Sequence, residues 1–229
     1  MFAAFAWTIL AAGSLTLLLA LGALVLASVL GLALAYGKLS RRRWLMRLVQ
    51  GFTFVIRGIP DLVLMLLVFY SLPAAINQFL EWTGSDLWVE FPPFWAGMFT
   101  LGVIFSAYMC ETFKSALQNI PRGQLEAAQA FGLHPRRIFW RITLPQLARL
   151  ALPGFTNNWL VLVKATALVS LLGLQDVMFR AKGAAEATGQ PFTYYLIAGG
   201  FYLAATLVST FALLALARRL EQTNQAGRT

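Results

Sequence analysis

The sequence holds few charged residues, one cysteine and one histidine. Charged residues make up 12% of the 229 positions, whereas they make up about a quarter of a typical soluble domain. Cys110 stands alone, which excludes a disulfide framework, and neither a cysteine pair nor a histidine cluster indicates a structural metal site. No G-x-x-x-x-G-K-[ST] phosphate loop occurs, and one histidine offers little acid–base chemistry. These absences argue against a soluble protein, an ATPase and a membrane enzyme.

Five apolar segments dominate what is present. Each is long enough to cross a hydrocarbon core about 30 Å thick as a helix, and they cover residues 8–36, 52–79, 94–115, 150–174 and 192–217. The first exceeds the roughly 7–15 apolar residues of a signal-peptide core and has no basic segment before it, so we expect a retained span. Arg57, Gly58 and Pro60 interrupt the second, whose beginning is alternatively an interfacial stretch leading into a shorter span from about Asp61. We therefore predict an all-α membrane protein of one domain, residues 1–229, with about five transmembrane helices.

Basic residues alternate between the connections and predict the orientation. The connections at 38–47 and 118–149 and the tail, which includes Arg228, hold thirteen Lys and Arg, against two in the other connections. Because cytoplasmic loops carry the excess of Lys and Arg, the N-terminus is expected outside and the C-terminus in the cytoplasm. The same rule explains the formal charge of +9 without nucleic acid as a partner.

The connection at residues 118–149 does not have the composition of a disordered loop. Pro121 is placed to open a helix, and Gly132 stands where a C-terminal helix cap belongs. A second short helix can start at Pro135 and must end before Pro145, because proline is incompatible with a regular helix interior. The sequence therefore predicts a helix–turn–helix on the cytoplasmic surface, here named the cytoplasmic shelf (residues 118–149).

Six residues of the shelf have the spacing of a known motif: Glu126, Ala127, Ala128, Gly132, Leu144 and Pro145. Together they resemble the EAA motif of ABC-importer permeases, the coupling segment that sits in a groove on the ATP-binding subunit. The small side chains of Ala127 and Ala128 suit the approach of a partner surface, Gly132 permits a sharp turn, and Glu126 offers an acceptor. An amphipathic helix lying on anionic lipid is the alternative, but it does not require the full spacing.

The resemblance to permeases of the polar amino-acid uptake family extends along nearly the whole chain. It is carried by the runs at residues 57–67, 107–124, 152–159 and 164–174. Within that family, the run at 57–67 and the pair Asn157–Asn158 look most similar to permeases for histidine, lysine, arginine and ornithine. Importers of the opines octopine and nopaline are the alternative.

The resemblance implies a type I ABC importer permease fold in the bacterial inner (cytoplasmic) membrane, and a transport subunit that is not an enzyme. Such a chain binds no cofactor itself, and its partner uses ATP and Mg²⁺. The implied partners are a homologous permease subunit in a heterodimer, two ATP-binding subunits, a periplasmic or extracellular solute-binding protein and the lipid bilayer. A self-sufficient secondary transporter is the alternative from another class, but no inverted repeat is visible and the EAA motif has no role there.

Polar residues within the predicted spans are candidates for a substrate path, because an ionisable side chain there costs about 2.5–3.5 kcal/mol. They are Asp61, Tyr108, Glu111, Asn157, Asn158, Lys164, Thr166 and Ser170. Asp61 and Glu111 can compensate a cationic substrate; alternatively, Glu111 and Lys164 neutralise each other and fix helix packing. Tyr108 can cap a substrate or simply pack. The polar residues of the fourth span either line a path or form interhelical hydrogen bonds.

Overall fold

The computed structural model describes residues 2–226, with side chains up to Arg219, and every regular element in that range is a helix. Arg228, counted above, lies outside the described residues. The first half contains α1 (Phe2–Ala11), α2 (Gly13–Lys38), α3 (Arg43–Gly58), α4 (Asp61–Leu66), the π-helical η1 (Leu67–Ser71), α5 (Leu72–Trp82) and α6 (Pro93–Gln118). The second half contains α7 (Arg122–Ala130), α8 (Pro135–Ile138), the π-helical η2 (Phe139–Thr143), α9 (Leu144–Ala165), the 3₁₀-helical η3 (Thr166–Leu172), α10 (Val177–Thr188) and α11 (Pro191–Ala226).

Five helical stretches within the described residues are long and apolar enough to cross a membrane, as predicted. They are Phe2–Lys38, Asp61–Trp82, Pro93–Gln118, Pro135–Leu172 and Pro191–Arg219. The second begins at Asp61, which confirms the shorter of the two alternatives, and the preceding α3 is a separate helix. The break lies at Ile59, whose extended backbone (φ −101°, ψ 137°) is the conformation that a following proline favours.

The core of the bundle lies where α2 crosses α6. Ala20, Ala23 and Ala27 of α2 are fully buried there. A methyl group added at Gly31 would lie 3.1 Å from the backbone oxygen of Ser106, so a side chain at that position would push the two helices apart. Small residues let membrane helices approach closely, and the resulting packing holds the bundle together.

The fourth span corrects the expectation that the short helix from Pro135 ends before Pro145. The helix starts at Pro135 but continues through Pro145 into α9. A π-helical turn, η2, occupies the residues just before Pro145. This wider turn accommodates a proline that lacks an amide hydrogen and crowds the preceding turn. The second helix of the shelf and the fourth span are therefore one continuous helical path, from Pro135 to Leu172.

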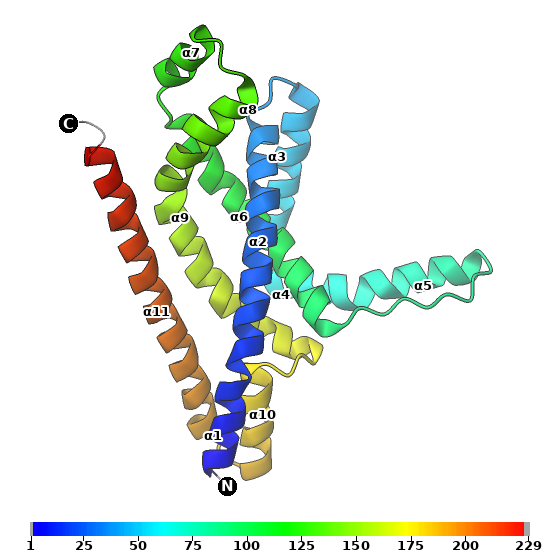
Figure 1. Ribbon diagram of the computed structural model, residues 1–229. Helices are drawn as coiled ribbons and strands as arrows, with labels where there is room; N and C mark the ends of the chain where they lie inside the picture. Colours follow the sequence, from blue (N-terminus) through cyan, green and yellow to red (C-terminus); the bar gives the residue numbers. More distant parts are fainter. Residues whose placement is uncertain (1, 227–229) are drawn as a thin grey trace.

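The second span leads into an arm that stands away from the bundle. In Figure 1, α5 runs outward at a steep angle to the other spans, and the chain returns beside it to α6. The Asn77 side-chain amide joins α5 to the returning segment. Its Nδ2 donates to the Val89 carbonyl at 2.8 Å, and its Oδ1 accepts from the Val89 amide at 2.7 Å. At the foot of Figure 1, α1, α10 and the start of α11 form a second small core around Ile9 and Tyr194.

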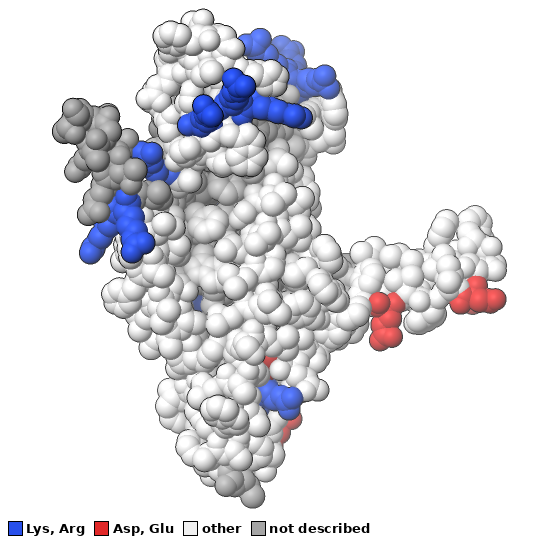
Figure 2. Space-filling view, viewed as in Figure 1, with Lys and Arg blue, Asp and Glu red and all other residues white. Residues whose placement is uncertain are grey.

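Charges of opposite sign gather on different parts of the molecule. Figure 2 shows Lys and Arg side chains around α8, at the junction of α2 with α3 and near the C-terminal end of α11, whereas the arm carries acidic side chains. The loop after α5 holds Asp86 and Glu90 and no base. The end of the molecule that carries the shelf is thus the basic end.

Asp176 caps α10 from a fully buried position. Its Oδ1 accepts a hydrogen bond from the Phe179 amide at 2.9 Å, while its Oδ2 has no partner among the described residues. Thr16 of α2 accepts from the neighbouring Val177 amide at 3.3 Å, so the start of α10 is fastened to the bundle. Burial raises the pKa of Asp176 to about 6, although hydrogen bonds from backbone amides oppose that rise.

Asp176 therefore makes the stability of the fold depend on pH. Its pKa in the folded protein, about 6, lies above the unfolded value of 3.8. The contribution of the protonated Asp176 carboxyl to the stability of the fold is therefore complete below pH 3.8 and is lost as the pH rises through about 6. Asn caps helices as well as Asp but carries no charge. Asp176→Asn should therefore raise the free energy of unfolding by about 2–4 kcal/mol at pH 8 and by little at pH 4. Unfolding in detergent, followed by circular dichroism, measures both values; equal stability of the two proteins at pH 8 would contradict this account.

Candidate functional site

The cytoplasmic shelf consists of two short helices joined by a glycine turn. Gly132 has a φ of +70°, which glycine adopts at little cost and other residues rarely adopt. Its amide donates to the Gln129 carbonyl at 2.9 Å, and the Leu133 amide donates to the Ala128 carbonyl at 3.1 Å. These bonds satisfy the last carbonyls of α7, as a left-handed C-terminal cap does. The turn predicted from Gly132 is confirmed.

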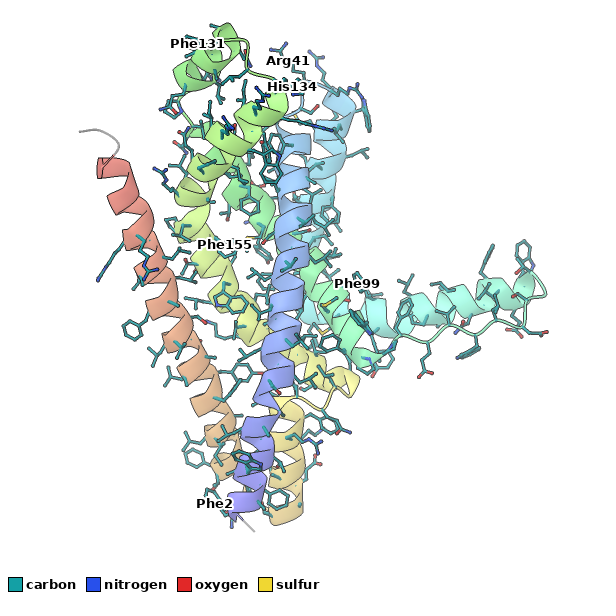
Figure 3. All side chains as sticks on the ribbon, in the orientation of Figure 1. Phe2, Arg41, Phe99, Phe131, His134 and Phe155 are labelled. Carbon is teal, nitrogen blue, oxygen red and sulfur yellow. The ribbon has the colours of Figure 1, made fainter. Side chains whose placement is uncertain are left out.

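The two faces of α7 have different surroundings. Glu126 and Ala127 are exposed, whereas Ala128 is 5% exposed and packs within this chain. The small side chain of Ala128 therefore serves the packing of α7 against α8 and η2, whereas Ala127 is left free to meet a partner. Phe131, which follows α7, is 87% exposed and is labelled at the outer end of the shelf in Figure 3. The motif alone gave no sign of this exposed aromatic residue at the turn.

One polar contact fixes α7 to the fourth span, and another caps α8 locally. The Gln146 Nε2 donates to the Gln124 Oε1 at 2.7 Å and thereby joins α7 to the first turn of α9. The His134 Nδ1 accepts from the Arg136 amide at 3.3 Å and caps α8. Leu144 is half-buried and Pro145 exposed at the start of α9. A force applied to α7 is therefore applied to α9 as well.

A basic groove opens between α2, α3 and α6. The cavity has a volume of about 830 Å³, and its charged lining residues are Lys38, Arg47, Arg57 and Glu111. Lys38 forms an ion pair with Glu111 and also donates to the Thr53 hydroxyl at 2.9 Å. Lys114 lies 3.8 Å from the other carboxylate oxygen of Glu111. Glu111 is thus neutralised by Lys38 and Lys114, and the predicted alternative of a pair with Lys164 is wrong.

Asp61 and Tyr108 lie near the same groove. The Arg57 guanidinium sits over the Tyr108 ring, 5.3 Å from its centroid, within the distance of a cation–π interaction. Asp61 begins α4, which packs against α6, the helix that bears Tyr108. The structure therefore brings Asp61, Tyr108 and Glu111 to one region, with Arg57 among them.

The polar residues of the fourth span are divided. Asn158 is buried, and its Nδ2 donates to the Thr112 hydroxyl at 3.0 Å, which joins α9 to α6. The Thr166 and Ser170 hydroxyls donate to the backbone carbonyls of residues 163 and 167 within their own helix. Asn157 and Lys164 are exposed and lie seven residues apart, hence on one face of α9. For Asn158 the interhelical hydrogen bond is observed; only Asn157 and Lys164 face away from the bundle.

Lys38 is the residue of this region that sequence reasoning missed. It was counted with the basic connection after the first span, 73 positions from Glu111. The sequence does indicate that Glu111 needs a cationic partner, because a carboxylate at membrane depth requires a cation. It offers several cations, however, and does not show which residues of α2 lie beside which residues of α6.

The comparisons with known proteins agree along most of the chain. A family model described as "Binding-protein-dependent transport system inner membrane component" matches residues 27–222. The chain is 46% identical to the histidine/lysine/arginine/ornithine transport system permease protein HisQ of Escherichia coli (strain K12), over 94% of each chain. It is 34% identical to the octopine transport system permease protein OccQ of Rhizobium radiobacter, over 89% of this chain and 86% of the relative.

The fold matches solved structures of the same class of protein. A crystal structure of an amino acid ABC transporter with histidines superposes with a TM-score of 0.78 at 27% identity, over 95% of this chain and 96% of the other. The expected type I importer permease fold is thereby confirmed.

The pair of Lys38 with Glu111 should be coupled energetically. Lys38→Met and Glu111→Gln should each lower the free energy of unfolding by about 1.5–3 kcal/mol, since the first leaves Glu111 with only the more distant Lys114 and the second leaves Lys38 without its carboxylate. The double variant should lose less than the sum of the two, because neither charge remains. Denaturant unfolding in detergent measures all four proteins.

An exposed ion pair in α10 supplies the matched control. Lys182 and Glu186 lie 3.8 Å apart with side chains 60% and 69% exposed, so Lys182→Met and Glu186→Gln should be additive within about 0.5 kcal/mol. If the losses in the free energy of unfolding at Lys38 and Glu111 were additive within the same limit, their contact would contribute nothing to stability.

Proposed function

Because this chain belongs to the family of binding-protein-dependent transport system inner membrane components, we propose that it carries a basic amino acid into the cytoplasm. It is the permease subunit of an ABC importer in the inner membrane, and a separate subunit hydrolyses ATP. The proposed cargo is histidine, lysine, arginine or ornithine, on the strength of 46% identity over 94% of the chain to a permease named for these four substrates. An opine is the alternative, which the octopine permease supports at lower identity.

The importer contains ATP-binding and solute-binding partners, and we propose a second, homologous permease beside this chain. The arm supports this proposal. Phe79 and Trp82 of α5 and Trp88 of the return segment are at least 60% exposed, and irregular backbone at membrane depth must be covered by protein or water rather than lipid. A neighbouring permease would cover both the exposed aromatic side chains and the irregular backbone of the arm. Each of the two permeases would then contact one ATP-binding subunit.

We propose that the N-terminus lies outside and the C-terminus in the cytoplasm. The arginines around α8 and near the end of α11, with the acidic arm farther along the molecule (Figure 2), support this orientation because cytoplasmic loops carry the excess of Lys and Arg. The solute-binding protein then docks at the end that carries α1 and α10. ATP-binding subunits meet the shelf.

We propose that the coupling contact consists of Glu126, Ala127 and Phe131, with Gly132 setting the turn and Leu144–Pro145 transmitting movement to α9. Exposure of the first three supports a contact, and the Gln124–Gln146 hydrogen bond supports transmission. A large exposed apolar side chain such as Phe131 has the character of an interface anchor. ATP-driven closure of the partners would move the shelf and rock the spans.

For the substrate path we propose the face of α9 that bears Asn157 and Lys164, together with the groove at Asp61, Tyr108 and Glu111. A polar and a charged residue on one exposed face of a spanning helix support this, because such residues face a cavity or another subunit rather than lipid. Asn158, Thr166 and Ser170 serve packing and local hydrogen bonds. Lys164 and Arg57 suit the carboxylate that every amino acid carries, and the neighbouring permease would add acids for a basic side chain.

The cargo is tested by uptake into proteoliposomes that contain the complete importer with its own binding protein. Labelled arginine should enter when ATP is inside, and excess histidine, lysine or ornithine should reduce that uptake at least tenfold, whereas octopine should not. If octopine reduced the uptake of labelled arginine and the basic amino acids did not, the proposed cargo would be an opine instead.

Glu126→Lys should lower ATP-dependent uptake at least tenfold, since it reverses the charge that the coupling contact offers, while insertion into the membrane stays normal. The control is Glu126→Asp, which keeps the negative charge at the same position of α7; it should retain most of the ATP-dependent uptake. Normal uptake by Glu126→Lys would remove Glu126 from the contact.

A further inference from the structure

We propose that the groove between α2 and α9 binds an anionic phospholipid of the cytoplasmic leaflet, with an acyl chain in the groove and the phosphate on Arg137 and Arg141. The cavity has a volume of about 360 Å³, within the range of about 300–1,000 Å³ that ligand pockets occupy. Nothing in the transport cycle proposed above requires it.

The walls of the groove are apolar and belong to three spans. Val29 and Leu32 come from α2, Phe113 from α6, and Leu144, Ala148 and Phe155 from α9. Figure 3 labels Phe155 on α9, at the side that faces α2. Because α2, α6 and α9 all belong to membrane-spanning stretches, the groove lies at the depth of the acyl chains. An acyl chain fills such a groove without leaving a polar group unpaired.

The cytoplasmic end of the groove is basic and aromatic. Arg137 and Arg141 precede Leu144, the groove residue nearest α8, and both are exposed. Trp140, between them in sequence, is 65% exposed, and tryptophan favours the headgroup level of a membrane. Figure 2 shows basic side chains over α8, on the same face as this recess. Basic pockets between spanning helices on the cytoplasmic side are suited to anionic headgroups.

Charge complementarity selects an anionic lipid over a neutral one. The chain has no Asp or Glu from Gly13 to Lys38 or from Leu133 to Leu174, so neither α2 nor the α8–α9 path brings a carboxylate to the site. Glu111 of α6, the acid nearest in sequence to Phe113, is paired with Lys38 and Lys114. The arginines therefore have no acidic competitor from these three elements.

Thermal unfolding of the purified chain in mixed micelles tests the site. Phosphatidylglycerol should raise the unfolding temperature at a lower mole fraction than phosphatidylcholine does. In the double variant Arg137→Gln/Arg141→Gln, the mole fraction of phosphatidylglycerol that gives half of the maximal stabilisation should rise about thirty-fold, because each arginine near the membrane surface contributes roughly five-fold. Arg41→Gln/Arg42→Gln, which removes the same charge from the neighbouring connection, should change it less than three-fold.

Blocking the groove separates a lipid site from a merely charged surface. Ala148→Trp should abolish the preference for phosphatidylglycerol although both arginines remain. Should the tryptophan prevent folding, Ala148→Leu replaces it in the test and should weaken the preference. Val25→Trp, at an exposed position of α2 outside the groove, is the control and should keep the preference. A full preference in the Ala148 variants would overturn the proposal.

Two further measurements distinguish other occupants. Glycerol 3-phosphate has the headgroup chemistry without the chains, so it should give no comparable stabilisation; an equal effect would indicate a soluble phosphate site instead. The preference for phosphatidylglycerol should also persist in the assembled importer. Its loss on assembly would mean that a protein subunit, not a lipid, covers the groove.

Discussion

A hydrocarbon environment tolerates a charge only where another charge or polar group meets it, and the ion pair of Lys38 with Glu111 meets this requirement where α2, α3 and α6 come together. Lys38 ends α2, Glu111 lies in α6, and the Thr53 hydroxyl draws α3 to the same ammonium group. The three elements that form the basic groove thus share one contact. The close approach of α2 and α6 at Gly31 brings the two charges together, because bulkier residues would hold the helices apart.

The same requirement separates the power source from the path. A chain that must bury most of its surface in lipid has little room for a nucleotide site, and this one has no phosphate loop. We propose that its contact with the ATP-binding subunit is a surface, α7 and Phe131, which the turn at Gly132 joins to the helical path of the fourth span. The π-helical turn before Pro145 lets α8 continue into α9, and the Gln124–Gln146 hydrogen bond joins α7 to the same helix.

Local features could be predicted from the sequence, whereas contacts between distant segments could not. The glycine turn at Gly132 and the span beginning at Asp61 follow from backbone preferences that one or two residues express. The helix through Pro145 was missed because proline usually ends a helix, and the π-helical turn that absorbs it leaves no pattern in the residues. The Lys38–Glu111 pair and the burial of Ala128 depend on the packing of helices across the chain, which periodicity does not specify.

The central claim is that this chain provides the path and that its partner provides the power. Uptake of labelled arginine into proteoliposomes, compared between this chain alone and the complete importer with and without ATP, tests it most directly. The account predicts accumulation only when the ATP-binding subunit and ATP are both present. Accumulation by this chain alone, driven by an ion gradient, would contradict it.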